Sequence, residues 1–158
     1  MIDEIQAPSA KTLIIPGLAG LYARCSTCSY AIMRVMMGLV LLPGGIDKLF
    51  YGGVGRIAAN NVVKAGLYPP ELWAWVVGGL EFFGALLLIA GLWTRPVAFA
   101  LAIEMAVITF RIRFDDGFFV TPRGGGMEIA VLLLLICVAL LFGGGGRYSA
   151  DRLIGREF

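Results

Sequence analysis

Four ionisable side chains lie inside or at the edge of long apolar runs: Arg34, Glu81, Glu104 and Glu128. A charge at the centre of a membrane span costs roughly 2.5–3.5 kcal/mol on insertion scales, so such residues face protein and are paired, hydrogen-bonded or protonated. With Lys48, which lies near the end of the first run, they are our candidates for a polar pocket that binds a quinone-like head group or passes protons. The alternative is a buried network that fixes the register of the helices.

Glu81 lies near the midpoint of the most apolar stretch, Leu72 to Leu92. At helical spacing its face consists of small or apolar residues, which let a neighbouring helix approach closely: Ala74, Gly78, Ala85 and Leu88. We therefore expect Glu81 to point into a helix bundle. Arg34 is the partner that we expect for it if the two side chains lie at a similar depth.

Cys25 and Cys28 form a CxxC motif just before the first long apolar run. The motif is a candidate redox pair or half of a metal site, because thiolates are favoured at a helix N-terminus. The alternative is that both are small packing residues. The chain has no histidine, and its cysteines do not have the spacing of a ligand set. We therefore predict no metal site and find no haem, flavin or iron–sulfur signature.

Composition places these residues in a membrane. Of the 158 residues, 59% are hydrophobic, and the charged residues fall between or at the ends of the apolar runs. The formal net charge is +2, with the basic residues scattered along the chain, so nucleic-acid binding is not expected. The sequence predicts an integral membrane protein in contact with the lipid bilayer.

The apolar runs predict an all-α membrane protein built as a four-transmembrane-helix bundle. The spans are expected at about 30–50, 72–92, 96–110 and 127–142. Residues 1–29 are expected to form a tail with a short interfacial segment at about Leu13 to Tyr22, and residues 143–158 a C-terminal tail. An even number of spans puts both termini on one side, for which the distribution of Lys and Arg weakly favours the cytoplasm.

Small residues also mark a surface on which another protein could dock. They recur every four residues in the third span, as Ala98, Ala102 and Ala106. A stripe of this kind permits close helix packing. We expect it to bind a protein partner or a second copy of the chain.

A set of short motifs follows the chain in this order: Arg34-x3-Gly38, Gly45-Ile-Asp-Lys48, Glu81-x2-Gly84, Gly91-Leu-Trp-Thr-Arg95, Asp116-Gly117-Phe118-Phe119, and Glu128 with Gly146-Arg147-Tyr148-Ser149-x-Asp151. In order and spacing, this set resembles the DoxX family of small four-span membrane proteins. Two positions depart from the family pattern: many members have a histidine where this chain has Gly44 and Arg113.

This resemblance implies a protein of the bacterial cytoplasmic membrane that is tied to quinone-linked oxidoreduction. One branch of the family supplies a subunit of thiosulfate:quinone oxidoreductase. The matching polar positions are Arg34, Lys48, Glu81 and Glu128. We expect a membrane subunit that binds a quinone and supports electron transfer by a partner, whether or not it is itself catalytic. The alternatives are a structural or assembly subunit of a larger complex and a small transporter.

Overall fold

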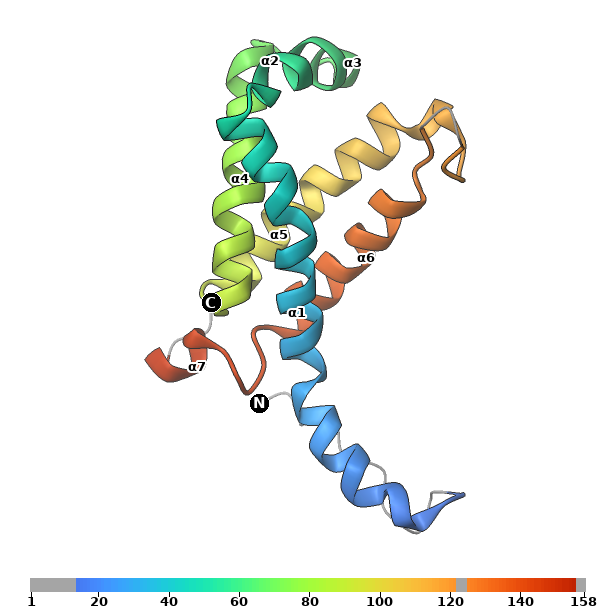
Figure 1. Ribbon diagram of the computed structural model, residues 1–158, viewed down its shortest axis with the longest axis vertical. Coiled ribbons are helices and arrows are strands. Elements are labelled where there is room, and N and C mark those ends of the chain that lie inside the picture. Colours follow the sequence, from blue (N-terminus) through green and yellow to red (C-terminus); the bar gives the residue numbers. More distant parts are fainter. Residues whose placement is uncertain (1–13, 122–124, 156–158) are drawn as a thin grey trace.

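The computed structural model describes residues 14–121 and 125–155, and helices dominate them (Figure 1). The all-α prediction is therefore confirmed. Four helices of 14 residues or more build the bundle: α1 (Ala19–Phe50), α4 (Pro70–Ala90), α5 (Thr94–Val107) and α6 (Glu128–Gly143). Shorter elements precede, connect or follow them: η1 (Pro16–Leu18), α2 (Gly53–Ile57), η2 (Ala58–Val62), α3 (Val63–Ala65), η3 (Ile108–Ile112), η4 (Phe114–Asp116) and α7 (Ala150–Ile154).

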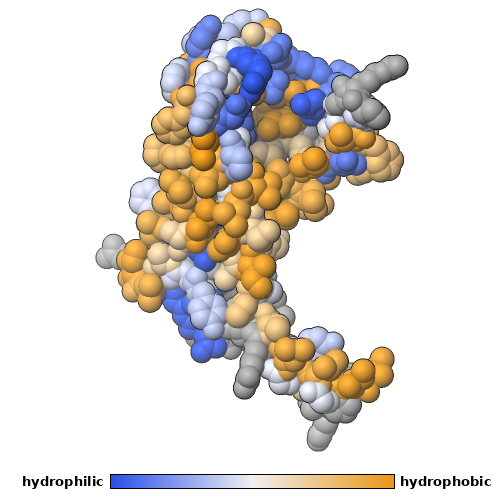
Figure 2. All heavy atoms as spheres, in the orientation of Figure 1, coloured by the Kyte–Doolittle hydropathy of each residue, from blue (hydrophilic) through white to orange (hydrophobic). Residues whose placement is uncertain are grey.

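Two helices in the described part of the chain are long and apolar enough to cross a membrane: the Cys28–Phe50 part of α1 and the whole of α4. The α6 helix is apolar but shorter. The surface agrees with this assignment, because apolar side chains cover the middle of the bundle in Figure 2, while hydrophilic ones gather toward its ends. Large apolar side chains such as Phe83, Phe99 and Leu135 are exposed there, as a lipid-facing surface requires.

The first long helix starts earlier than the expected span. Pro16 and Gly17 lie directly before it, and from Ala19 the chain stays helical through Tyr30 to Phe50. Residues 19–22 of the expected interfacial segment are therefore the first turn of α1, whereas Leu13 lies outside the described residues. Figure 1 shows this first part of α1 projecting away from the bundle.

The long helices pack as two pairs, α1 with α4 and α5 with α6. The pairs meet in one core, and Figure 1 shows them diverging toward the end at which α1 finishes. At that end Lys64 on α3 forms an ion pair with Asp116 on η4, with 3.5 Å between Nζ and Oδ1. The core residues come from all four helices: Met37, Leu41, Ala85, Leu88, Val97, Ala98, Leu101, Ala102, Met105, Cys137 and Leu140.

This core corrects the expected docking surface. Ala98 and Ala102 are buried inside the chain, where α5 packs on its neighbours, and Ala106 is half-buried. Small residues allow close packing whether the neighbouring helix belongs to the same chain or to another. The stripe thus serves the protein's own bundle.

Candidate functional site

The candidate site begins at a close contact between α1 and α4. A Cβ atom added at Gly45 would lie 2.5 Å from the backbone nitrogen of Phe82, and one at Gly38 would lie 2.7 Å from the carbonyl oxygen of Ala85. At Gly78 a Cβ atom would lie 3.1 Å from the Cβ atom of Lys48. Because these glycines have no side chains, the two backbones approach closely enough to place Lys48 beside α4.

Lys48 is the partner of Glu81. Its Nζ donates a hydrogen bond to Oε2 of Glu81 in an ion pair whose side chains are 13% and 7% exposed. The neighbouring Gly44 leaves room for this contact, since a Cβ atom there would lie 2.9 Å from the same Oε2 atom. As the sequence predicted, Glu81 points into the bundle, and the four residues that share its face are buried.

Glu104, on α5, completes the site from the second helix pair. It is 8% exposed, and neither carboxyl oxygen has a hydrogen-bond partner among the described residues. Its carboxyl group interacts electrostatically with Glu81 and Lys48. We call Lys48, Glu81 and Glu104 the polar cluster. It combines one cation with two carboxyl groups in an apolar core, and this arrangement can bind a proton or hydrogen-bond a polar ligand.

The structure contradicts the expected pair between Arg34 and Glu81. Arg34 is buried at the other end of the α1–α4 contact, where its Nη2 donates a 2.8 Å hydrogen bond to the carbonyl oxygen of Tyr148. Its guanidinium occupies the space beside Gly91, because a Cβ atom at that glycine would lie 1.3 Å from Nη1 of Arg34. Arg34 therefore holds the C-terminal segment against α1 and α4.

Asp151 has a structural role that the sequence did not predict. Its Oδ1 accepts a 2.7 Å hydrogen bond from the backbone N–H of Trp93, and its Oδ2 accepts a 3.0 Å bond from that of Thr94. Its own N–H donates to the carbonyl oxygen of Gly91 at 2.9 Å. Asp151 thus caps the start of α5. Two of the quoted motifs, Gly91 to Arg95 and Gly146 to Asp151, meet at this contact, which explains why they occur together.

Three other candidate residues lie outside the polar cluster. Glu128 is the first residue of α6 and is half-buried, and among residues 14–121 and 125–155 no hydrogen bond or ion pair links its side chain to the cluster. Cys25 and Cys28 lie one turn apart on the early part of α1, and each is a free cysteine. Their redox role stays a prediction.

Comparison with known proteins gives a family match. The model of the DoxX family matches residues 29–113. An uncharacterized protein of Haemophilus influenzae is 30% identical over 77% of this chain and 87% of its own length. An uncharacterized membrane protein of Mycobacterium tuberculosis is 29% identical over 82% of this chain and 83% of its own length. A Bacillus subtilis protein named "Putative oxidoreductase CatD" is 30% identical over 78% of this chain and 84% of its own length. No solved structure matches.

Proposed function

Since this chain belongs to the DoxX family and is a membrane protein, we propose that it binds a quinone at the polar cluster and supports quinone-linked oxidoreduction in the bacterial cytoplasmic membrane. The observation that carries this proposal is the buried carboxyl group of Glu104 beside the Lys48–Glu81 ion pair. The Bacillus subtilis relative carries the name "Putative oxidoreductase CatD", which also supports a role in oxidoreduction.

The polar cluster suits a quinone head group. The two carbonyl oxygens of a quinone accept hydrogen bonds, and the cluster offers the ammonium group of Lys48 and the acid form of Glu104 as donors. Two carboxyl groups that lie close together in an apolar core can share one proton, which one of them can donate. Conversion of a quinone to a quinol consumes two electrons and two protons. In this proposal a partner protein supplies the electrons, and the cluster supplies hydrogen bonds and a route for protons.

The proposal includes a topology in which α1, α4, α5 and α6 each cross the bilayer. Consecutive long helices run in opposite directions in Figure 1, and the start of α1 lies at the same end of the bundle as α7. Four crossings would place both termini on one side. Arg147 and Arg152 are exposed at that end, which favours the cytoplasm.

Two variants of Glu104 test the binding site with purified full-length protein in lipid nanodiscs. Glu104→Leu removes the donor, whereas Glu104→Gln keeps a donor of nearly the same shape. A buried quinone oxygen that is left without its donor costs about 1–3 kcal/mol, which corresponds to roughly 5- to 160-fold in affinity. We expect the leucine variant to lower quinone affinity within that range and the glutamine variant to lower it less than about threefold.

Glu71→Gln is the matched control, because Glu71 is exposed in the first turn of α4. We expect both Glu104 variants to fold, because an apolar core tolerates a leucine in place of a buried ionisable residue. Thermal unfolding of each variant checks this. Equal quinone affinity in the wild type and in Glu104→Leu would refute the site. The site would also be refuted if the wild-type protein retained phospholipid but bound none of the added quinone.

The assembly-subunit alternative is weaker than the sequence suggested. Its docking surface consisted of Ala98, Ala102 and Ala106, and the first two are buried in the chain's own core. The transporter alternative gains no specific support from the packing of the described helices. We therefore retain quinone binding as the function to test first.

A further inference from the structure

A second candidate binding site lies far from the polar cluster, where the C-terminal segment crosses α1. A shallow groove of about 420 Å³ runs along the surface there, and its lining is apolar. The α1 helix supplies five of the lining residues and the C-terminal segment the sixth: Cys28, Ala31, Ile32, Val35, Met36 and Tyr148. The groove begins at Cys28, where the apolar part of α1 begins, so it lies at the boundary between lipid head groups and acyl chains.

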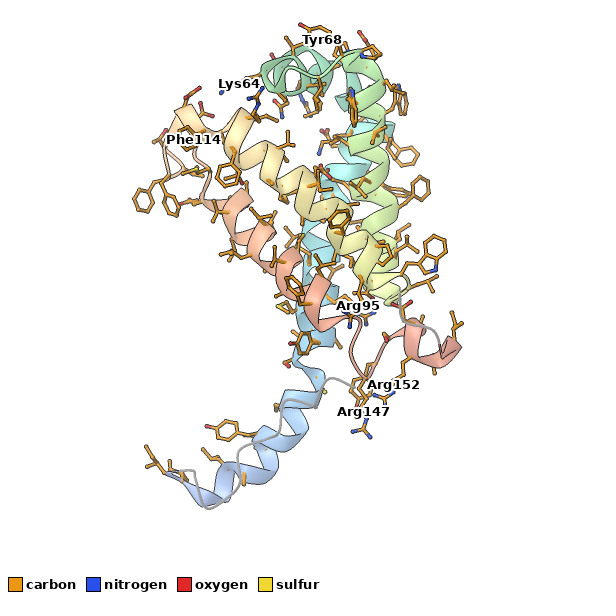
Figure 3. All side chains as sticks on the ribbon, turned by 180° about the vertical axis from the view of Figure 1, so that it is seen from behind. Lys64, Tyr68, Arg95, Phe114, Arg147 and Arg152 are labelled. Atoms are coloured by element: carbon orange, nitrogen blue, oxygen red, sulfur yellow. The ribbon has the colours of Figure 1, made fainter. Side chains whose placement is uncertain are left out.

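Two exposed arginines lie in the C-terminal segment that contributes Tyr148 to this groove. Arg147 is the neighbour of Tyr148 in the chain, and Arg152 follows in α7; Figure 3 shows both at this end of the bundle. Neither side chain forms an ion pair with any residue that the structure describes. The nearby carboxylate of Asp151 is already committed to the start of α5.

The opposite end of the molecule has a different arrangement of charge. There Arg56 pairs with Asp47, while Lys64 and Arg113 both pair with Asp116. Each of these three cations therefore has a carboxylate partner within the protein. No carboxylate of the described residues pairs with Arg147 or Arg152, so an external anion can neutralise their charge.

The α7 helix indicates that this anion belongs to a lipid. Leu153 is 90% exposed, and Ile154 beside it is exposed as well, next to the charged Arg152. A short segment with apolar and basic side chains of this kind lies in the membrane interface, with its apolar part in the acyl region. The arginines are then at the depth of the phosphate groups, and the groove is at the depth of the first acyl carbons.

We propose that this end of the protein binds one anionic phospholipid, with an acyl chain in the groove and the phosphate on Arg147 and Arg152. A free inorganic anion would not use the apolar groove, and a zwitterionic lipid would gain less from two unbalanced cations. This site is independent of the quinone site. Either proposal can fail without affecting the other.

Native mass spectrometry of the full-length protein tests this site. The protein is released from nanodiscs that contain equal amounts of phosphatidylglycerol and phosphatidylcholine with identical acyl chains. We expect one phosphatidylglycerol to be retained in preference to phosphatidylcholine. The variant Arg147→Ala/Arg152→Ala should lose this preference by roughly 30-fold, because each basic residue near the surface contributes about fivefold.

The matched control is Lys64→Ala/Arg113→Ala, which removes two positive charges from the opposite end and should leave the preference unchanged. Ala31→Trp fills the groove without altering any charge, and it should lower retention of both lipids. Equal retention of the two lipids by the wild type would overturn the proposal. An identical effect of both double variants would do the same, because it would show a response to net charge alone.

Discussion

At the scale of single residues, one glycine determines where a buried cation can lie. Gly91 has φ +72° at the end of α4, and the space that a side chain would need is filled by the guanidinium of Arg34. From that position Arg34 donates to the backbone of the C-terminal segment. The residue that the sequence suggested as the partner of Glu81 is thus a structural clamp at the opposite end of the same helix pair.

Gly91→Ala should therefore destabilise the protein. The left-handed conformation costs an L-residue about 1–2 kcal/mol, and the new methyl group must also displace Arg34 from its hydrogen bond. We expect the free energy of unfolding in detergent to fall by about 2 kcal/mol or more. Gly79→Ala, also in α4, is the control, because a Cβ atom there meets no other atom within 4 Å. Equal stability of the two variants would contradict the clamp.

At the scale of elements, the antiparallel register of α1 and α4 decides which polar groups meet. Gly38 lies against Ala85, Gly45 against Phe82, and Lys48 against Gly78. Following this register toward the start of α1 places Arg34 against Gly91. Gly91 follows Glu81 by ten residues, which is roughly 15 Å along the axis of α4. Arg34, which lies beside Gly91, is therefore too far along the helix pair to contact Glu81.

Substitutions at two adjacent glycines test this register. At Gly45 an added methyl group would meet the backbone of Phe82, which cannot move without separating the helices. At Gly44 it would meet the end of the Glu81 side chain, which can rotate. We expect Gly45→Ala to lower the free energy of unfolding by about 1–3 kcal/mol, as overpacking does, and Gly44→Ala to lower it less. If Gly44→Ala is the more destabilising variant, the assigned contact is wrong.

The sequence predicted the helices and the inward face of α4 well, because hydrophobic periodicity records burial. Glu81 and its neighbours on that face are buried as expected. The pairing of charges was less predictable, since it depends on the register between helices, which periodicity does not contain. Lys48 was among the predicted pocket residues, but its pairing was not predicted, and its long side chain reaches the buried carboxylate of Glu81. The position of Asp151 depends on a contact between distant segments, which a single sequence does not reveal.

At the scale of the whole molecule, the two helix pairs are joined at both ends by polar contacts. At one end the C-terminal segment binds Arg34 and the start of α5. At the other end the Lys64–Asp116 ion pair links the connection after α1 to the connection after α5. The polar cluster lies between these joints and receives residues from both pairs.

Single cysteines test the proposed four crossings in a variant whose three native cysteines are replaced by alanine. Asn60→Cys and Asp115→Cys should react with a membrane-impermeant maleimide from one side of the membrane. Tyr22→Cys and Arg147→Cys should react from the other side, and all four native residues are exposed. We expect the second pair to be labelled from the cytoplasm. Labelling of Asn60→Cys and Asp115→Cys from opposite sides would exclude the four-crossing arrangement.

The cap on α5 also constrains how the protein is made. Asp151 follows Thr94 by 57 residues in the chain, so a ribosome adding 5–20 residues per second reaches it roughly 3–11 s later. During that interval the first N–H groups of α5 lack this partner, and Arg34 lacks the backbone carbonyl of Tyr148. The bundle is completed only after all four long helices have been translated. A chain that stops before Tyr148 would therefore leave the translocon with every long helix present and the fold still open.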